Sequence, residues 1–301
     1  MSVDPAAVRD AGGTVVPDGS GVAIRGWTVQ AVKAPILRDA DTDQFREDLG
    51  KAKNTPEQLF ADSRLVLSHE HTGITLSFTA KAALQAWQAA KVPPVKVLSA
   101  QTWMSTREKD VAAHQAVSFE YDWTYTTDYA GSMDVDSIAD ASRVQASWEP
   151  TNEGMDRSML MARDPILFWD EVPLYESELD DNGVSQLRVK VRVMPRCWYV
   201  LLRFFLRVDQ VLVKLRETRL FCPFSTDSTV GPIIREIKYS EGTFEELSKA
   251  GAPADGAAYE NADSAAMALQ AVAPIGLKHL QSDKLVVKQD SLQMQAQPAS
   301  S

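Results

Sequence analysis

Two histidines separated by one residue are the first feature of the chain that could support chemistry. In the segment HEH, His69 and His71 would point to the same side of a strand, because side chains alternate along a strand. Two imidazoles on one face can supply two metal ligands, but a catalytic zinc needs a third protein ligand and an open position. No third ligand is evident nearby. The alternative is a pair of imidazoles on the solvent face of a hairpin.

The other nucleophiles and acids give weaker patterns. Cys197 and Cys222 fall on predicted strands that could be neighbours, so both a disulfide and two reduced, buried thiols fit. Neither has a histidine close in sequence to act as its base. The carboxylates of DEV (170–172) and DDNG (180–183) fit an acid–base pair or ordinary solvated turns. Phosphate-binding loops, dinucleotide fingerprints, nucleophile elbows and C-x-x-C pairs are absent from the sequence.

Two arginines interrupt an apolar run and form a stronger pattern. Arg203 and Arg207 lie in LLRFFLRV, and a buried arginine needs a carboxylate partner. One interpretation is an internal network that fixes strand register, and the other is a groove whose arginine binds a peptide carboxylate. The candidate carboxylate partners are Asp122, Asp128, Asp170 and Glu171.

The elements that must position these residues are mainly strands. Alternation of apolar and polar residues is clearest at 187–193, where Leu and Val face one way and Arg and Lys the other, as in a half-exposed antiparallel strand. Alternation with ten-residue helices is missing there, which argues against a doubly wound parallel sheet. Strand patterns cover 21–37, 64–79 (a hairpin turning near Gly73), 166–183, 185–196 and 198–221 (turning near Asp209–Gln210); helix patterns cover 41–54, 80–91, 154–165 and pieces of 241–281.

The segment FEYDWTYTTDYAGS (119–132) is predicted to lie in a further strand pair. Its period of two places Phe119, Tyr121, Trp123 and Tyr125 on one face, and Glu120, Asp122, Thr124 and Thr126 on the other. Aromatic strands stack single-stranded bases in some folds. Lys and Arg are absent between positions 110 and 142, so we discard nucleic-acid binding and predict an aromatic core face.

Composition sets the class of protein. The chain has 301 residues, 45% hydrophobic and 24% charged, with net charge −10 and pI near 5.0, which is typical of a soluble globular protein and argues against nucleic-acid or anionic-membrane binding. Two cysteines and no secretory signal favour a reducing compartment, cytoplasmic with the nucleus as a second expectation. We expect a disordered arm (1–21), a single domain (22–288) and a disordered tail (289–301).

Long motifs in the right order resemble the TOR signalling pathway regulator-like family (TIPRL). The resemblance implies an α+β fold with a mainly antiparallel sheet core and peripheral helices. It also implies a regulator without catalytic activity or cofactor, which acts in TOR signalling. Such a regulator binds catalytic subunits of type 2A and related Ser/Thr phosphatases and inhibits them or controls their assembly. The motifs are GWTVQAVKAPI (26–36), TPEQLFADSRLVLSHEHTGITLSFTAKAAL (55–84), YDWTYTTDYAG (121–131), ILFWDEVPLYESELDDNGVSQLRVKVRVMP (166–195), LLRFFLRVDQVLVKLRETRL (201–220) and, loosely, DKLVV (283–287).

The resemblance also implies partner-contacting positions. Leu215 and Glu217 match a segment of the family that contacts the phosphatase and usually carries Met and Asp, and Met155 takes the place of an aliphatic contact. Lys81 stands where the family can present an acid, which reverses the charge. Gln210 replaces a glycine expected in the turn.

The resemblance also implies binding of the phosphatase's C-terminal tail. We infer that Arg203, Arg207 or Arg219 would suit the anionic end of that tail.

Three hypotheses follow for the function. The first is a phosphatase-binding regulator, the second a metal-dependent enzyme using His69 and His71, and the third a scaffold for other partners of the TOR pathway.

Overall fold

Three twelve-residue strands form the centre of the molecule. They are β13 (Gly183–Met194), β14 (Cys197–Val208) and β15 (Leu212–Pro223), joined in register by tight antiparallel turns. The predicted alternation is confirmed, since Leu187, Val189, Val191 and Val193 of β13 are buried while Arg192 is exposed. The computed structural model describes residues 2–50, 55–90, 95–98, 118–124, 127–135, 144–225, 231–253, 256–271 and 278–289.

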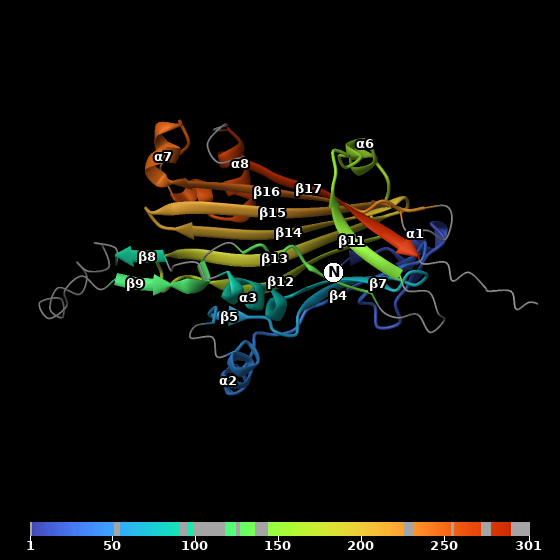
Figure 1. The fold of residues 1–301 in the computed structure, drawn as a ribbon, viewed down its shortest axis with the longest axis horizontal. Coiled ribbons are helices and arrows are strands. Elements are labelled where there is room, and N and C mark those ends of the chain that lie inside the picture. The colour runs from blue at the N-terminus through green and yellow to red at the C-terminus, as the bar shows by residue number, and fades with distance from the viewer. Residues whose placement is uncertain are drawn as a thin grey trace, which may run out of the picture.

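These strands are part of a nine-stranded antiparallel sheet (Figure 1). The turn between β14 and β15 holds Gln210 at φ 61°, in the left-handed region that glycine would adopt at no steric cost. The strand order is β1 (Ser2–Val3), β12 (Phe168–Ser177), β13, β14, β15, β16 (Ile234–Thr243), β17 (Lys278–Gln289) and β11 (Val144–Pro150), with β5 (Gln58–Leu59) also paired to β12.

A second, six-stranded sheet covers one face of the first, and this face is called the inner face. The main core lies between the two sheets, where Trp27 meets Trp198 edge to face at 5.2 Å between ring centroids. Helix α3 (Ala80–Ala89), capped by Thr79, packs against the second sheet. The strand order is β10 (Ser132–Val135), β7 (Ile74–Thr79), β6 (Arg64–His69), β4 (Trp27–Val32), β3 (Gly21–Ile24) and β2 (Thr14–Val15).

The opposite, outer face of the nine-stranded sheet is covered only in part. At one end, α7 (Phe244–Lys249) and α8 (Ala262–Ala271) cover an apolar cluster that includes Phe205, Val213 and Leu215. At the other end, the segment around α6 (Arg157–Met161) packs on a smaller apolar cluster. Figure 1 shows these helices along the top of the view, and α3 and α2 (Asp39–Asp48) at the bottom.

The N-terminal segment differs from the sequence prediction. Residues 1–21 were expected to be disordered, but β1 pairs with β12 and α1 (Pro5–Asp10) follows, with Asp4 accepting hydrogen bonds from two backbone N–H groups of its first turn. Val8 is fully buried. Residues 1–21 contain few large apolar side chains, so one buried valine and a helix cap give only a weak sequence signal of ordered structure. Residues 290–301 of the expected tail lie outside the described residues.

The aromatic segment also differs from the prediction. Strand β9 (Ser118–Tyr121) pairs with β8 (Val95–Leu98) but ends at Tyr121, and a single 3₁₀ turn (Asp122–Thr124) follows. Tyr121 is buried as predicted, and its hydroxyl donates to the Leu179 carbonyl at 2.7 Å. Thr124 was assigned to the opposite face but is also buried, because its hydroxyl donates to the Tyr121 carbonyl and the strand period is lost. Residues 125–126 lie outside the described part of the chain.

Helices were predicted less accurately than strands. The pieces expected over 241–281 include α7 and α8, but β16 extends to Thr243 and β17 begins at Lys278. None of the helices within the described residues has the length and apolar character needed to cross a lipid bilayer.

We predict that Cys197 and Cys222 do not form an intramolecular disulfide. Cys222 lies opposite Trp198 in the ladder, so it faces the main core, whereas Cys197 lies in the outer cluster beneath α6. Burial raises the pKa of both thiols, that of Cys197 to about 11, which disfavours the reactive thiolate. Mild oxidation followed by mass spectrometry should show both as free thiols. Alkylation should be slow in the native protein and complete in urea, and a native Cys197–Cys222 crosslink would contradict the strand register.

Candidate functional site: a charged outer face and a methionine-lined groove

A chain of four charged side chains crosses the middle of the outer face, between its two apolar clusters. Glu217 of β15 lies directly opposite Arg203 of β14, and its Oε1 accepts from Arg203 Nε at 2.9 Å and Nη2 at 2.5 Å. Its Oε2 accepts from Arg219 Nη2, and Arg203 Nη1 donates to Asp263 of α8. We call Asp263–Arg203–Glu217–Arg219 the charged chain. It connects α8 at one end of the face with the region of α6 at the other.

Glu217 is the most buried member of the charged chain, with 5% of its surface exposed. Burial alone would raise the pKa of this carboxyl group, but the charges of Arg203 and Arg219 and their hydrogen bonds outweigh burial and hold the pKa below its ordinary value. Arg203 shows the mirror effect, because its pKa is raised by Glu217 and Asp263 against the opposing influence of burial. The carboxylate therefore stays ionised and keeps both guanidinium groups in place.

A groove of about 290 Å³ opens between α6 and the sheet, and we call it the α6 groove. Its apolar lining is rich in sulfur: Met155, Met161 and Met194 contribute side chains together with Leu160 and Tyr199. Met161 is 82% exposed at the rim. Unbranched methionine side chains adapt their shape to a ligand, so this wall suits apolar side chains of varied shape.

The charged lining of the α6 groove is mostly positive. Arg157, Arg192 and Arg219 line it with one acid, Glu236, whose Oε1 accepts from the Met155 backbone N–H at 3.3 Å. In the part of the chain that the structure describes, Arg157 and Arg192 form no ion pair. Three arginines against one glutamate give the apolar groove an excess of positive charge, and guanidinium groups bind carboxylates well.

The structure brings only two of the predicted contact residues into this groove. Met155 and Arg219 line it. Leu215 is 5% exposed and packs beneath α7 and α8, and Glu217 lies inside the charged chain. Both side chains therefore lie beneath the outer surface, where Leu215 packs under the helices and Glu217 holds the arginines in place.

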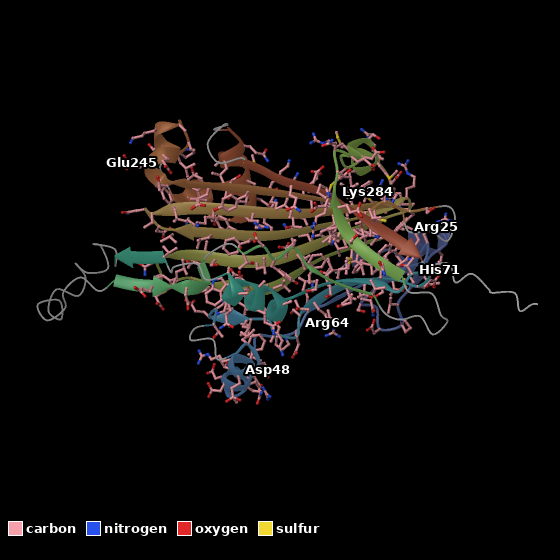
Figure 2. All side chains as sticks on the ribbon, viewed as in Figure 1. Arg25, Asp48, Arg64, His71, Glu245 and Lys284 are labelled. Carbon is pink, nitrogen blue, oxygen red and sulfur yellow. The ribbon has the colours of Figure 1, made fainter. Side chains whose placement is uncertain are left out.

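Arg207 and Lys81 lie elsewhere. Arg207 donates to Asp209 at 2.7 Å and to the Tyr259 carbonyl at 3.2 Å, which ties the β14–β15 turn to the α7–α8 segment. Lys81 lies on α3 and donates to Asp48 of α2 at 2.8 Å. Figure 2 shows Asp48 at the bottom of the view and Lys284, which pairs with Glu153 next to α6, in the upper half. Lys81 is therefore on the opposite side of the nine-stranded sheet from the α6 groove.

The carboxylate partners proposed for Arg203 and Arg207 were wrong. Asp170 is buried on the inner face, where its Oδ1 accepts from Lys33 at 2.6 Å. Glu171 lies 3.5 Å from both Arg188 and Lys190, and Asp128 lies 3.6 Å from Arg216. Strand alternation places Arg203 on the outer face, out of reach of the inner-face Asp170, whereas Glu171 shares the outer face but pairs with Arg188 and Lys190.

The histidine pair does not form a metal site among the described residues, where no group of three His, Cys, Asp or Glu could hold an ion. His69 is 2% exposed, against the expected solvent position, and its Nδ1 lies 3.0 Å from the Thr72 hydroxyl. The β6 strand ends at His69, and His71 is half exposed with its Nε2 3.1 Å from Glu70 Oε1. The two rings meet edge to face instead of converging on one point.

Sequence reasoning missed Arg157, Arg192, Met194 and Tyr199 as groove residues. Arg192 was assigned correctly to the polar side of β13, but the sequence carries no sign of which helix covers that side. Residues brought together from β13, β14, β15, β16 and the α6 segment can be assembled only when the strand order is known.

Comparison with known proteins identifies the chain's relatives. The model of the TIP41-like family matches residues 58–248. The chain belongs to the TIP41-like family. The family that the motifs indicated is confirmed.

Curated relatives agree along much of their length. A TIP41-like protein of Arabidopsis thaliana is 37% identical over 279 residues, 90% of this chain and 94% of the relative. A TIP41-like protein of Homo sapiens is 37% identical over 195 residues, 65% of this chain and 68% of the relative. The protein named type 2A phosphatase activator TIP41 of Saccharomyces cerevisiae is 30% identical over 244 residues, 76% of this chain and 65% of the relative. That name describes a regulator of an enzyme.

We predict that Glu217→Gln lowers the free energy of unfolding by about 3 kcal/mol, because Arg219 loses its carboxylate partner and the partly buried Arg203 keeps only Asp263. Asp48→Asn is the control, since it breaks the exposed pair with Lys81 and should cost at most about 1 kcal/mol. Urea unfolding measures both variants. Equal losses in the two variants would show that the charged chain contributes no more than a surface pair.

We predict that His69 makes stability depend on pH. Burial, and secondarily the charge of His71, lower the pKa of His69 to about 4, whereas the unfolded chain takes up this proton near pH 6.5. The contribution of neutral His69 to the free energy of unfolding is fully present above pH 6.5. Up to about 3 kcal/mol of this free energy is lost as the pH falls from 6.5 to about 4. Urea unfolding between pH 7 and 4 should show a smaller loss for His69→Gln than for the wild type. Parallel curves would contradict the prediction.

Proposed function

We propose that this chain is a non-catalytic regulator that binds the catalytic subunit of type 2A and related Ser/Thr phosphatases and controls their activity and assembly in TOR signalling. The α6 groove carries the proposal, because its three arginines and methionine wall match an acidic chain segment with apolar side chains. The segment we propose for it is the phosphatase's C-terminal tail. The regulatory names of the fungal relatives support the same role.

The proposal gives the predicted contact residues different tasks. Met155 and Arg219 contact the partner in the groove. Glu217 and Arg203 hold Arg219 at the groove's edge, and Arg207 holds the α7–α8 segment. Lys81 would contact the partner only where it extends around to α3.

The direction of the effect on phosphatase activity is part of the test. The resemblance implied inhibition or control of assembly, whereas the two fungal relatives are named activators. One mode of binding serves either outcome, because a regulator bound beside an active site can block it or hold it in its active form. Phosphatase activity measured with and without a stoichiometric amount of this chain gives the direction.

The first experiment is co-purification with a type 2A catalytic subunit, followed by a binding titration. Arg192→Glu should weaken binding at least about tenfold, because it reverses a charge in the groove without breaking an ion pair within the described residues. Arg64→Glu is the matched control, since Arg64 is exposed on β6 and the change in net charge is the same (Figure 2).

Two outcomes would decide against the proposal. If this chain does not bind the catalytic subunit, the result would favour the hypothesis of a scaffold for other partners. Equal affinities of Arg192→Glu and Arg64→Glu would remove the α6 groove from the interface. Elemental analysis of the same sample tests the metal hypothesis, which requires a stoichiometric metal ion.

A further inference from the structure

Helix α8 is held on the outer face by a small apolar contact. Of its ten residues, five are alanine, and the side chains that it buries most deeply are Ala265 and Leu269. Met267 points away and is 73% exposed. Because hydrophobic stabilisation scales with buried apolar area, an alanine-rich surface adds little of it. An isolated helix of this length is also marginal in water, so α8 depends on its polar contacts with the sheet.

The polar contacts of α8 concentrate on one residue. Asp263 accepts from Arg203 and lies 3.5 Å from Lys190, while 70% of its own side chain is exposed. Asn261 accepts from the N–H groups of Asp263 and Ser264 and caps the helix independently of the sheet. Loss of the Asp263 contact would therefore loosen the helix from the sheet before it unwinds the first turn.

Arg203 is shared between two acids, and this sharing couples α8 to the α6 groove. Its guanidinium group divides its N–H donors between Asp263 and Glu217, and Glu217 in turn divides its oxygens between Arg203 and Arg219. An anion in the groove would attract Arg219 away from Glu217. Of the two arginines of the charged chain, Arg203 alone would then pair with Glu217. Arg203 then binds Glu217 more strongly and Asp263 less strongly.

We propose that α8 is a releasable cover whose docking opposes the binding of an acidic segment in the α6 groove. Release would remove the α8 part of the cover over the apolar cluster of Phe205, Val213 and Leu215, which lies beside Glu217. The coupling itself is a property of this chain, whereas its role in phosphatase binding rests on the proposed function. Linkage makes the effect reciprocal: loosening α8 strengthens binding in the groove.

The coupling can be tested without any partner. Arg219→Gln removes the cation at the groove end of the charged chain. Amide hydrogen exchange in α8 should then accelerate by about threefold or more, even though Arg219 lines the α6 groove at the other end of that chain. Arg219→Lys keeps the charge and should retain slow exchange. Arg192→Gln is the control, because Arg192 lines the same groove outside the charged chain. Exchange in β13 serves as the internal reference for global stability. Unchanged or slower exchange of α8 in Arg219→Gln would overturn the proposal.

The reciprocal arm uses the type 2A catalytic subunit as the probe. Asp263→Asn should bind it about threefold or more tightly than the wild type, and Glu260→Gln, at an exposed position just before α8, should bind as the wild type does. Equal or weaker binding of Asp263→Asn would overturn the coupling. If neither the wild type nor the variants bind, the proposed function fails, while the exchange experiment still decides the coupling.

Discussion

The structure depends on the strict alternation of side chains along β13, β14 and β15. Each strand is twelve residues long and pairs in register with its neighbours, so residues of one parity form the main core and those of the other form the outer face. The second sheet covers the inner face, which is mostly apolar on β13 and β14, and its charged residues Asp170 and Arg216 are paired with Lys33 and Asp128. The outer face is covered only at its ends, and charged residues occupy the middle. The core and the candidate binding surface are therefore two sides of the same strands.

Much of this architecture could be predicted from the sequence, because parity is a local property. The alternation of valines and arginines in β13 predicts which side chains face the core, without knowledge of the neighbouring strands. The charge partners could not be predicted in this way. Arg203 pairs with Asp263, sixty positions away, on a helix whose docking is not encoded near either residue. Asp170 and Glu171, which were expected to reach Arg203 across the sheet, pair with other cations.

The remaining errors arise where local rules compete. Tyr121 continues the period of two, but at Asp122 a turn replaces the strand and Thr124 becomes buried. The N-terminal segment has the composition of a disordered arm, yet Asp4 caps a helix there and Val8 reaches the core. Among the site residues, membership of the TIP41-like family drew attention to Leu215 and Glu217. Both lie below the surface in this structure, where Leu215 packs in the apolar cluster and Glu217 pairs with arginines.

The α6 groove has two walls of different stiffness. Its floor is formed by sheet strands, and on β14 Tyr199 of the groove directly follows Trp198, which packs against Trp27 in the main core. The arginines of the floor, Arg192 and Arg219, are thus held at a fixed spacing by paired strands of the nine-stranded sheet. The opposite wall consists of methionines and a helix of five residues. A site of this kind discriminates by the positions of a ligand's charges and tolerates substitution among its apolar side chains. During evolution a partner could change its apolar residues freely, while the spacing of its acidic groups would be constrained.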